Sequence, residues 1–138
     1  MLYHHCIIYT DGGARGNPGP AGIGVVVLDS HKKVIAEYRE YIGEATNNQA
    51  EYRAVLLALA KAKDLGAREI DFYLDSELVV KQLNQEYKVK DQDLGVLFVK
   101  IWNQLPDFQR VRFSHVRREQ NRRADRLVNQ VIDAAGKS

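Results

Sequence analysis

The first third of the chain alternates between apolar, β-branched runs and short polar segments. The run 6–10 predicts a first strand that ends at Asp11-Gly12-Gly13, and a loop rich in glycine and proline is expected over 12–22. The runs 23–29 and 34–42 predict two further strands, joined by a tight polar turn. Three consecutive strands with short connections predict an antiparallel meander.

From residue 48 the hydrophobic period changes to that of helices. The run 48–64, rich in alanine and leucine, predicts a helix that is capped by Thr46 or Asn47 and stopped at Gly66. The remaining pattern predicts a strand, two helices, a strand and a last helix, at 70–74, 76–86, 93–105, 111–116 and 122–135. The order βββαβααβα predicts an α/β fold with a mixed five-stranded sheet flanked by helices, in one domain over residues 1–138.

Composition narrows the class of protein. Of 138 residues, 45% are hydrophobic and 28% are charged, which fits one globular domain better than a disordered chain. The apolar runs are too short to span a bilayer and residues 1–5 lack the layout of a secretory signal, so no membrane association is expected. Cys6 is the single cysteine, which excludes an internal disulfide. A cytoplasmic location and, by default, a monomer are expected.

Charge is unevenly distributed along the chain. The net charge is only +2, yet seven arginines stand against two acids between Gln109 and Arg126, a local net charge of +5. An acidic body with a basic segment near its end is typical of a protein that binds a polyanion. A solvated helix face with internal salt bridges has the same composition, and charge alone favours that interpretation.

Four carboxylates stand out by their positions. Asp11 and Asp75 each follow a strongly apolar predicted strand, and ligands gather at the carboxyl ends of strands in open α/β sheets. Glu51 lies one turn inside the first predicted helix, and Asp125 lies near the start of the last. Each acid has a structural alternative, as a turn residue, as a helix cap at Asp75 or Ser76, or as a partner of a helix dipole. Position alone leaves both interpretations open.

If the four acids converge, their mutual repulsion requires a cation or bound protons. Hard oxygen ligands without a cysteine or histidine cluster indicate Mg²⁺ or Mn²⁺. Two such ions, about 3.5–4 Å apart, can activate a water and stabilise the leaving oxygen in phosphodiester hydrolysis. No organic cofactor is expected. The glycine-rich segment 12–22 lacks the Gly-Lys-Ser/Thr ending of a P-loop, and no helix can follow Gly136-Lys137-Ser138.

Five segments together resemble type 1 ribonuclease H, and the resemblance covers essentially the whole chain. They are Tyr9-Thr10-Asp11-Gly12-Gly13, Gly16-Asn17-Pro18-Gly19-Pro20, Thr46-Asn47-Asn48-Gln49-Ala50-Glu51, Asp75-Ser76, and His115 with Asn121 and Ala124-Asp125. The resemblance implies a ribonuclease H-like fold. It also implies endonucleolytic hydrolysis of the RNA strand of RNA–DNA hybrids with two metal ions, which leaves 3′-hydroxyl and 5′-phosphate ends.

The resemblance implies a role for each matching residue. Asp11, Glu51, Asp75 and Asp125 fall on the metal-binding carboxylates, and His115 falls on the histidine that serves proton transfer and product release. Substrate contacts are expected from Gly12, Asn17, Thr46, Asn47, Asn48 and Asn121. Within this set, the asparagines at 17, 47 and 48 fall on residues that contact the minor groove of the hybrid, and the threonine falls on one that holds a DNA-strand phosphate.

Two departures from the family pattern affect the expected substrate binding. Glu77 stands where many relatives have glutamine, so an acid replaces an amide that can donate hydrogen bonds. The short connection 87–92 lacks the basic handle that some bacterial members insert there, which leaves Lys88, Lys90 and the late arginines to bind phosphates. We therefore expect weaker and more salt-sensitive binding than in relatives with a handle.

Two other functions fit the same residues. One is a related nuclease with a broader substrate, such as double-stranded RNA. The other is a non-catalytic module that binds hybrids. The four acids argue against the binding module, because concentrated negative charge beside phosphates weakens binding.

Overall fold

The computed structural model describes residues 2–136, so residue 1 and residues 137–138 of the predicted domain lie outside the described residues. The elements follow the predicted order βββαβααβα, with two short 3-10 segments added. The strands are β1 (His5–Ala14), β2 (Gly19–Leu28), β3 (Val34–Ala45), β4 (Glu69–Leu74) and β5 (Arg110–His115). The helices are α1 (Asn47–Asp64), α2 (Glu77–Leu83), α3 (Gln92–Gln104) and α4 (Arg122–Ala135), and the 3-10 segments are η1 (Leu105–Asp107) and η2 (Arg118–Asn121).

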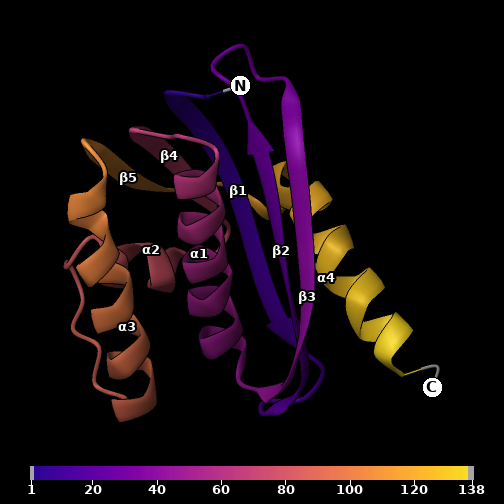
Figure 1. Ribbon diagram of the computed structural model, residues 1–138. Helices are drawn as coiled ribbons and strands as arrows, with labels where there is room; N and C mark the ends of the chain where they lie inside the picture. The colour runs from indigo at the N-terminus through magenta and orange to yellow at the C-terminus, as the bar shows by residue number, and fades with distance from the viewer. Residues whose placement is uncertain (1, 137–138) are drawn as a thin grey trace.

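A single five-stranded sheet in the order β3-β2-β1-β4-β5 forms the centre of the molecule (Figure 1). β1, β2 and β3 make the predicted antiparallel meander. β4 runs parallel to β1, and β5 runs parallel to β4. The predicted mixed sheet is therefore confirmed. α1 packs on one face together with α2 and α3, and α4 packs on the other face against β1, β2 and β3.

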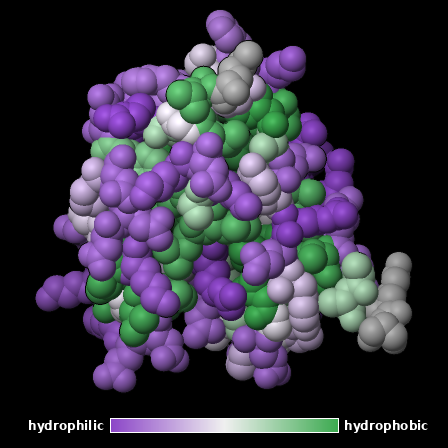
Figure 2. All heavy atoms as spheres, viewed as in Figure 1, coloured by the Kyte–Doolittle hydropathy of each residue, from purple (hydrophilic) through white to green (hydrophobic). Residues whose placement is uncertain are grey.

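The larger hydrophobic core lies between the sheet and α1, where the alternate residues of β1 and β4 that face this helix are fully buried. Ile8, Phe72 and Leu59 belong to this core. The face of α4 contributes a smaller cluster with Val26, Ala124 and Leu127. Figure 2 shows the α1 and α3 side as a mostly hydrophilic surface with hydrophobic side chains exposed in places. Among the described residues, no helix is long and apolar enough to cross a membrane.

The segment 12–22 was predicted as a loop, and this prediction is wrong. β1 continues to Ala14 and β2 begins at Gly19, so most of the segment is paired strand. Its glycines allow close packing of helices against the strands. A Cβ atom on Gly12 would lie 2.3 Å from the backbone carbon of Ala50 in α1, and one on Gly22 would lie 2.6 Å from Val131 Cγ1 in α4. Glycine is required at these two positions by α1 and α4, whereas Gly16, with a φ of +97°, serves the turn between the strands.

The observed helix starts show which residues cap α1 and α2, a point that the sequence pattern left open. Thr46 is the N-cap of α1, and it forms a capping box with Gln49. Ser76 is the N-cap of α2, which leaves the carboxylate of Asp75 free for other contacts. α2 ends at Leu83, three residues before the predicted end. The connection from α2 to α3 spans residues 84–91 and contains no helix.

Candidate active site

The parallel register of β1 and β4 brings two of the predicted acids to one place. Tyr9 pairs with Tyr73, so Asp11 and Asp75 stand level, two residues further along each strand. Asp75 directly follows β4, whereas Asp11 lies inside β1 and not at its end as predicted, because β1 continues in its pairing with β2. The parallel register, which sets the two acids level on neighbouring strands, therefore explains the convergence.

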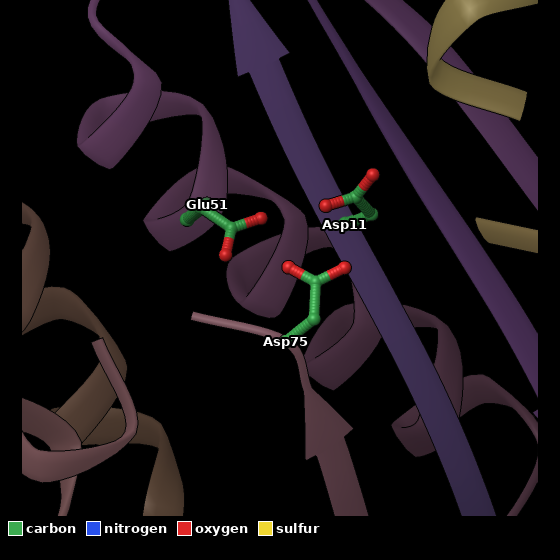
Figure 3. A group of neighbouring side chains, drawn as sticks. All are labelled: Asp11, Glu51 and Asp75. Carbon is green, nitrogen blue, oxygen red and sulfur yellow. The ribbon is translucent and has the colours of Figure 1, made fainter. Parts of the chain in front are cut away.

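Glu51 reaches the same place from the first turns of α1. The close approach that Gly12 allows between β1 and α1 lets its backbone N–H donate to Glu51 Oε1 at 2.5 Å. One carboxylate oxygen from each of Asp11, Glu51 and Asp75 lies within 4.8 Å of the others. Figure 3 shows the three carboxylates turned toward a common point from β1, α1 and the end of β4.

Asp125, the fourth predicted acid, lies outside this group of three but lines the same cavity as Asp11 and Asp75. The cavity has a volume of about 480 Å³. Asp125 comes from the first turn of α4, where Asn129 Nδ2 donates to its carboxylate at 3.4 Å. It is close enough to Asp11 to affect the pKa of that residue. The structure thus brings all four acids to one site, with Asp125 at its α4 side.

The charges of these acids are not balanced by the protein. Burial, together with the charges of Asp75 and Asp125, raises the pKa of Asp11 to about 8. Burial and the charges of Asp11 and Asp75 raise the pKa of Glu51 well above its ordinary value. Among the described residues, no lysine, arginine or histidine nitrogen lies within 4.0 Å of these carboxylates. The site therefore favours either bound protons or an external cation.

The geometry of the donors fits a divalent metal ion. Glu51 Oε2 is buried and has no hydrogen-bond partner among the described residues, although a buried polar atom normally has one. A hard cation between three carboxylates would satisfy this oxygen and neutralise the repulsion. Asp11, Glu51 and Asp75 are the residues that can hold such an ion, and Asp125 can complete the set.

Asn121 holds Asp75 in place, and the prediction that it contacts the substrate needs correction. Only 1% of its surface is exposed, so it cannot reach a bound nucleic acid. Its Nδ2 donates to the carbonyl oxygen of Thr10 at 2.9 Å and to Asp75 Oδ2 at 3.1 Å. The Asn121 side chain thereby connects η2 to β1 at Thr10 and to Asp75 after β4.

Asn17 and Asn47 tie the tip of the β1–β2 hairpin to the start of α1. Asn17 Oδ1 accepts from the backbone N–H of Asn47 at 3.0 Å, and Asn47 Oδ1 accepts from that of Ala14 at 2.8 Å. Both side chains are exposed, and their amide NH₂ groups make no hydrogen bond with the described residues. Asn48 is half-buried beside them, and the Thr46 hydroxyl accepts from the N–H of Gln49.

His115 is brought near the acids but does not line the cavity. It is the exposed last residue of β5 and pairs with Leu74, the residue before Asp75. Glu77, on the exposed surface of α2, forms an ion pair with Lys81 at 3.1 Å. Sequence reasoning missed Arg118, which lines the acidic cavity and an adjoining hollow next to Asp125. The arginine-rich segment was the available signal, but it did not distinguish this arginine from the other six.

Comparisons with known proteins identify the family of the chain. A family model described as reverse transcriptase-like matches residues 9–131. A bifunctional protein of Mycobacterium tuberculosis is 47% identical over 133 residues, and the chain spans only 36% of its length while 96% of the chain is covered. Ribonuclease HI of Halobacterium salinarum is 43% identical over 127 residues, which cover 92% of this chain and 64% of that protein.

Among solved structures, LC11-RNase H1 in complex with an RNA/DNA hybrid is similar over 94% of this chain and 98% of its own. Its TM-score is 0.90 and its sequence identity is 47%. The mixed five-stranded sheet and the group of three neighbouring carboxylates define a ribonuclease H-like protein. The chain belongs to the ribonuclease H family.

Proposed function

We propose that this chain is a metal-dependent endoribonuclease that hydrolyses the RNA strand of RNA–DNA hybrids and leaves 3′-hydroxyl and 5′-phosphate ends. The observation that carries the proposal is the group of Asp11, Glu51 and Asp75. One oxygen of each lies within 4.8 Å of the others, and no basic nitrogen among residues 2–136 lies within 4.0 Å of these carboxylates. The complex of the similar LC11-RNase H1 with an RNA/DNA hybrid supports the choice of substrate.

In this proposal the four acids, Asp125 included, hold two Mg²⁺ or Mn²⁺ ions. The ions supply positive charge that orients a water for attack and stabilises the leaving 3′-oxygen. Asn121 keeps the Asp75 carboxylate in its ligating orientation through the hydrogen bond at 3.1 Å. His115, exposed beside the end of β4, exchanges a proton with the departing product. Arg118 at the cavity contacts the phosphate.

The hairpin tip and the start of α1 form the surface proposed for the minor groove of the hybrid. The NH₂ groups of Asn17 and Asn47 are exposed and available to ribose 2′-hydroxyls, with Asn48 beside them. Thr46 lies at the same surface, next to a DNA-strand phosphate. Gly12 lines the acidic cavity, and its lack of a side chain lets β1 lie against α1 so that Glu51 reaches the other acids. Because these groups reach sugars and phosphates and not base edges, little sequence preference is expected.

Cleavage of an end-labelled hybrid tests the proposal. The hybrid, an RNA duplex, a DNA duplex and single strands are incubated with Mg²⁺ or Mn²⁺. Internal cuts in the hybrid RNA alone, abolished by EDTA and by Asp75→Asn, are expected. Equal cutting of duplex RNA would widen the proposed substrate class, and tight binding without any cutting would favour a binding module.

Binding is expected to be weaker than in a handle-bearing ribonuclease H, because the 84–91 connection carries no helix and leaves Lys88 and Lys90 to contact phosphates. Charge contacts with phosphates release counterions, so the logarithm of the affinity falls linearly with the logarithm of the salt concentration, with a slope that grows with the number of phosphates contacted. Fewer contacts should therefore make the slope shallower than in a handle-bearing protein, not steeper as expected from the sequence. Fluorescence anisotropy with a labelled hybrid across a salt series measures affinity and slope for both proteins, and an equal or steeper slope for this chain would contradict the prediction.

A further inference from the structure

The sheet face that turns away from α1 is open over β4 and β5. α4 packs against β1, β2 and β3, and the exposed side chains of Arg112 and Ser114 mark the uncovered part of β5. The register aligns Tyr9, Tyr73 and Ser114 as neighbours on β1, β4 and β5. Because alternate residues share a face, these three form a row across the open side of the sheet.

Two tyrosines in this row are stacked, and one of them has a free side. The rings of Tyr9 and Tyr73 lie 5.2 Å apart between centroids, with 27° between their planes. Tyr9 packs on its other side against the cluster of Val26 and Ala124. On its other side, Tyr73 pairs with Ser114 of the edge strand, a small and exposed residue. Among the described residues, Tyr73 has no aromatic or cation-π partner besides Tyr9, so the side of its ring toward Ser114 is available to a flat partner.

The charge beside the tyrosines is positive. Arg112 is exposed, and no carboxylate among the described residues lies within 4.0 Å of it. The acids on this face are already paired, since Arg110 Nη2 lies 2.9 Å from Glu69 and 3.7 Å from Asp71. An aromatic ring with an unpaired arginine next to it is suited to a base and its phosphate.

This surface lies next to the acidic site along the strands. Asp11 follows Tyr9 by two residues and Asp75 follows Tyr73 by two residues, so each acid stands one pleat repeat, about 7 Å, beyond its tyrosine. A strand held at the carboxylates can thus place a neighbouring nucleotide over Tyr73. That nucleotide must be unpaired, because a base inside a duplex is already stacked and paired.

We propose that Tyr73, supported by Tyr9 and flanked by Ser114 and Arg112, binds an unpaired nucleotide where a single strand leaves the hybrid. The inference rests on the proposed function, and it adds a class of substrate: hybrids that end in a single-stranded tail. Stacking of bases on the aromatic residues of an open sheet is a common way to hold single strands. The stack against Tyr9 keeps the Tyr73 ring in one orientation, which lowers the entropy lost on binding.

Binding of tailed and blunt hybrids tests this site. Labelled hybrids with a short unpaired RNA or DNA tail, at either end, are compared with a blunt hybrid of the same duplex by anisotropy in EDTA, and their KM values are compared in Mg²⁺. We expect a tail to tighten binding by about fivefold or more. A gain with RNA tails or with DNA tails supports the site and identifies the strand. Equal binding of tailed and blunt hybrids overturns it.

Three variants distinguish stacking of the tail on Tyr73 from a change in the overall affinity for the hybrid. Tyr73→Leu removes the aromatic face, and Ser114→Leu fills the space beside it without touching the core. Both are expected to lose the gain from the tail and to keep the affinity for the blunt hybrid. Tyr41→Leu, an exposed tyrosine on β3, is the matched control and keeps the gain. If Ser114→Leu and Tyr73→Leu both keep the gain, the inference is wrong.

The same assays distinguish this inference from the proposed function. Tail-dependent binding that Tyr73→Leu removes, in a protein that cuts no hybrid, would leave the stacking site intact and refute the nuclease. Cutting of blunt hybrids without any gain from a tail would support the nuclease and refute the stacking site.

Discussion

The acids near the two ends of the parallel pair of β1 and β4 have opposite surroundings. Near the amino end of β4, Glu69 and Asp71 lie beside basic side chains, with Arg110 Nη2 2.9 Å from Glu69 and His5 Nε2 2.7 Å from Asp71. Toward the carboxyl ends, Asp11 and Asp75 lie together with Glu51 of α1, and the described residues supply no basic nitrogen within 4.0 Å of them. The acids are thus paired with basic side chains at one end and left without them at the other.

The difference separates structural from functional charge. Glu69 and Asp71 near the amino end of β4 already have basic partners and need no bound ligand. Toward the carboxyl ends, burial together with the neighbouring acids raises the pKa of Asp11 to about 8, and Glu51 Oε2 is buried without a partner among the described residues. A fold retains such a costly arrangement where a ligand relieves it.

Asp75→Asn is expected to lower hybrid cleavage by more than about 100-fold, because it removes a ligand, and even residues that only support a ligand contribute 10- to 100-fold. Asp71→Asn, on the same strand, is expected to change the rate on a blunt hybrid by less than about twofold, since Asp71 contacts only His5 and Arg110. Initial rates at saturating Mg²⁺ measure both. A similar loss of cleavage rate in Asp75→Asn and Asp71→Asn would show that the acids at the two ends of β4 do not differ in function.

Asn121→Ala is expected to lower activity by about 10- to 100-fold and to raise the Mg²⁺ concentration needed for half-maximal rate, because Asp75 loses the donor that orients it. Gln82→Ala is the control. Gln82 is another buried amide, but it accepts from the hydroxyl of Tyr52 in the core. Its loss is expected to lower stability and leave the Mg²⁺ requirement unchanged. An unchanged Mg²⁺ titration in Asn121→Ala would argue for a merely structural role.

The sequence supports the element order well, since apolar period and caps are local signals. Thr46 followed by Gln49 predicts the start of α1, and the structure has the complete capping box there. Position at strand ends also suggested that Asp11 and Asp75 converge, and the parallel register brings them level. Both features depend on neighbouring residues in the chain or on a general rule of parallel sheets.

Features that depend on distant packing could not be predicted. The glycines of 12–22 look like a loop, because the pattern does not reveal that α1 and α4 press against those strands. Asn121 resembles a substrate residue until its burial between Thr10 and Asp75 is known. Arg118 is one of seven similar arginines, and only the cavity singles it out. To predict any of these three features, one must know contacts between residues that are far apart in the sequence.

The stability of the metal-free protein is expected to fall as the pH rises from about 4 to about 8. In this window the folded Asp11 keeps a proton that the unfolded chain has released, because its pKa is raised from 3.8 to about 8. The loss of stability is expected as a fall of several degrees or more in Tm. Thermal melts in EDTA at several pH values measure it. Asp11→Asn should flatten the profile, and an equally steep decline in that variant would assign the effect to other groups.

Arg110→Ala is expected to have the smallest effect. It tests whether the acids near the amino end of β4 bind a metal ion once they lose their arginine. It leaves Glu69 and Asp71 without the arginine, yet stability should fall by only about 1 kcal/mol or less, because water screens these partly exposed pairs. Added Mg²⁺ should raise the Tm of the variant by no more than it raises that of the unaltered protein. A larger rise would mean that unpaired acids suffice to bind the ion. An equal rise would mean that burial and convergence, which only the carboxyl ends combine, are also required.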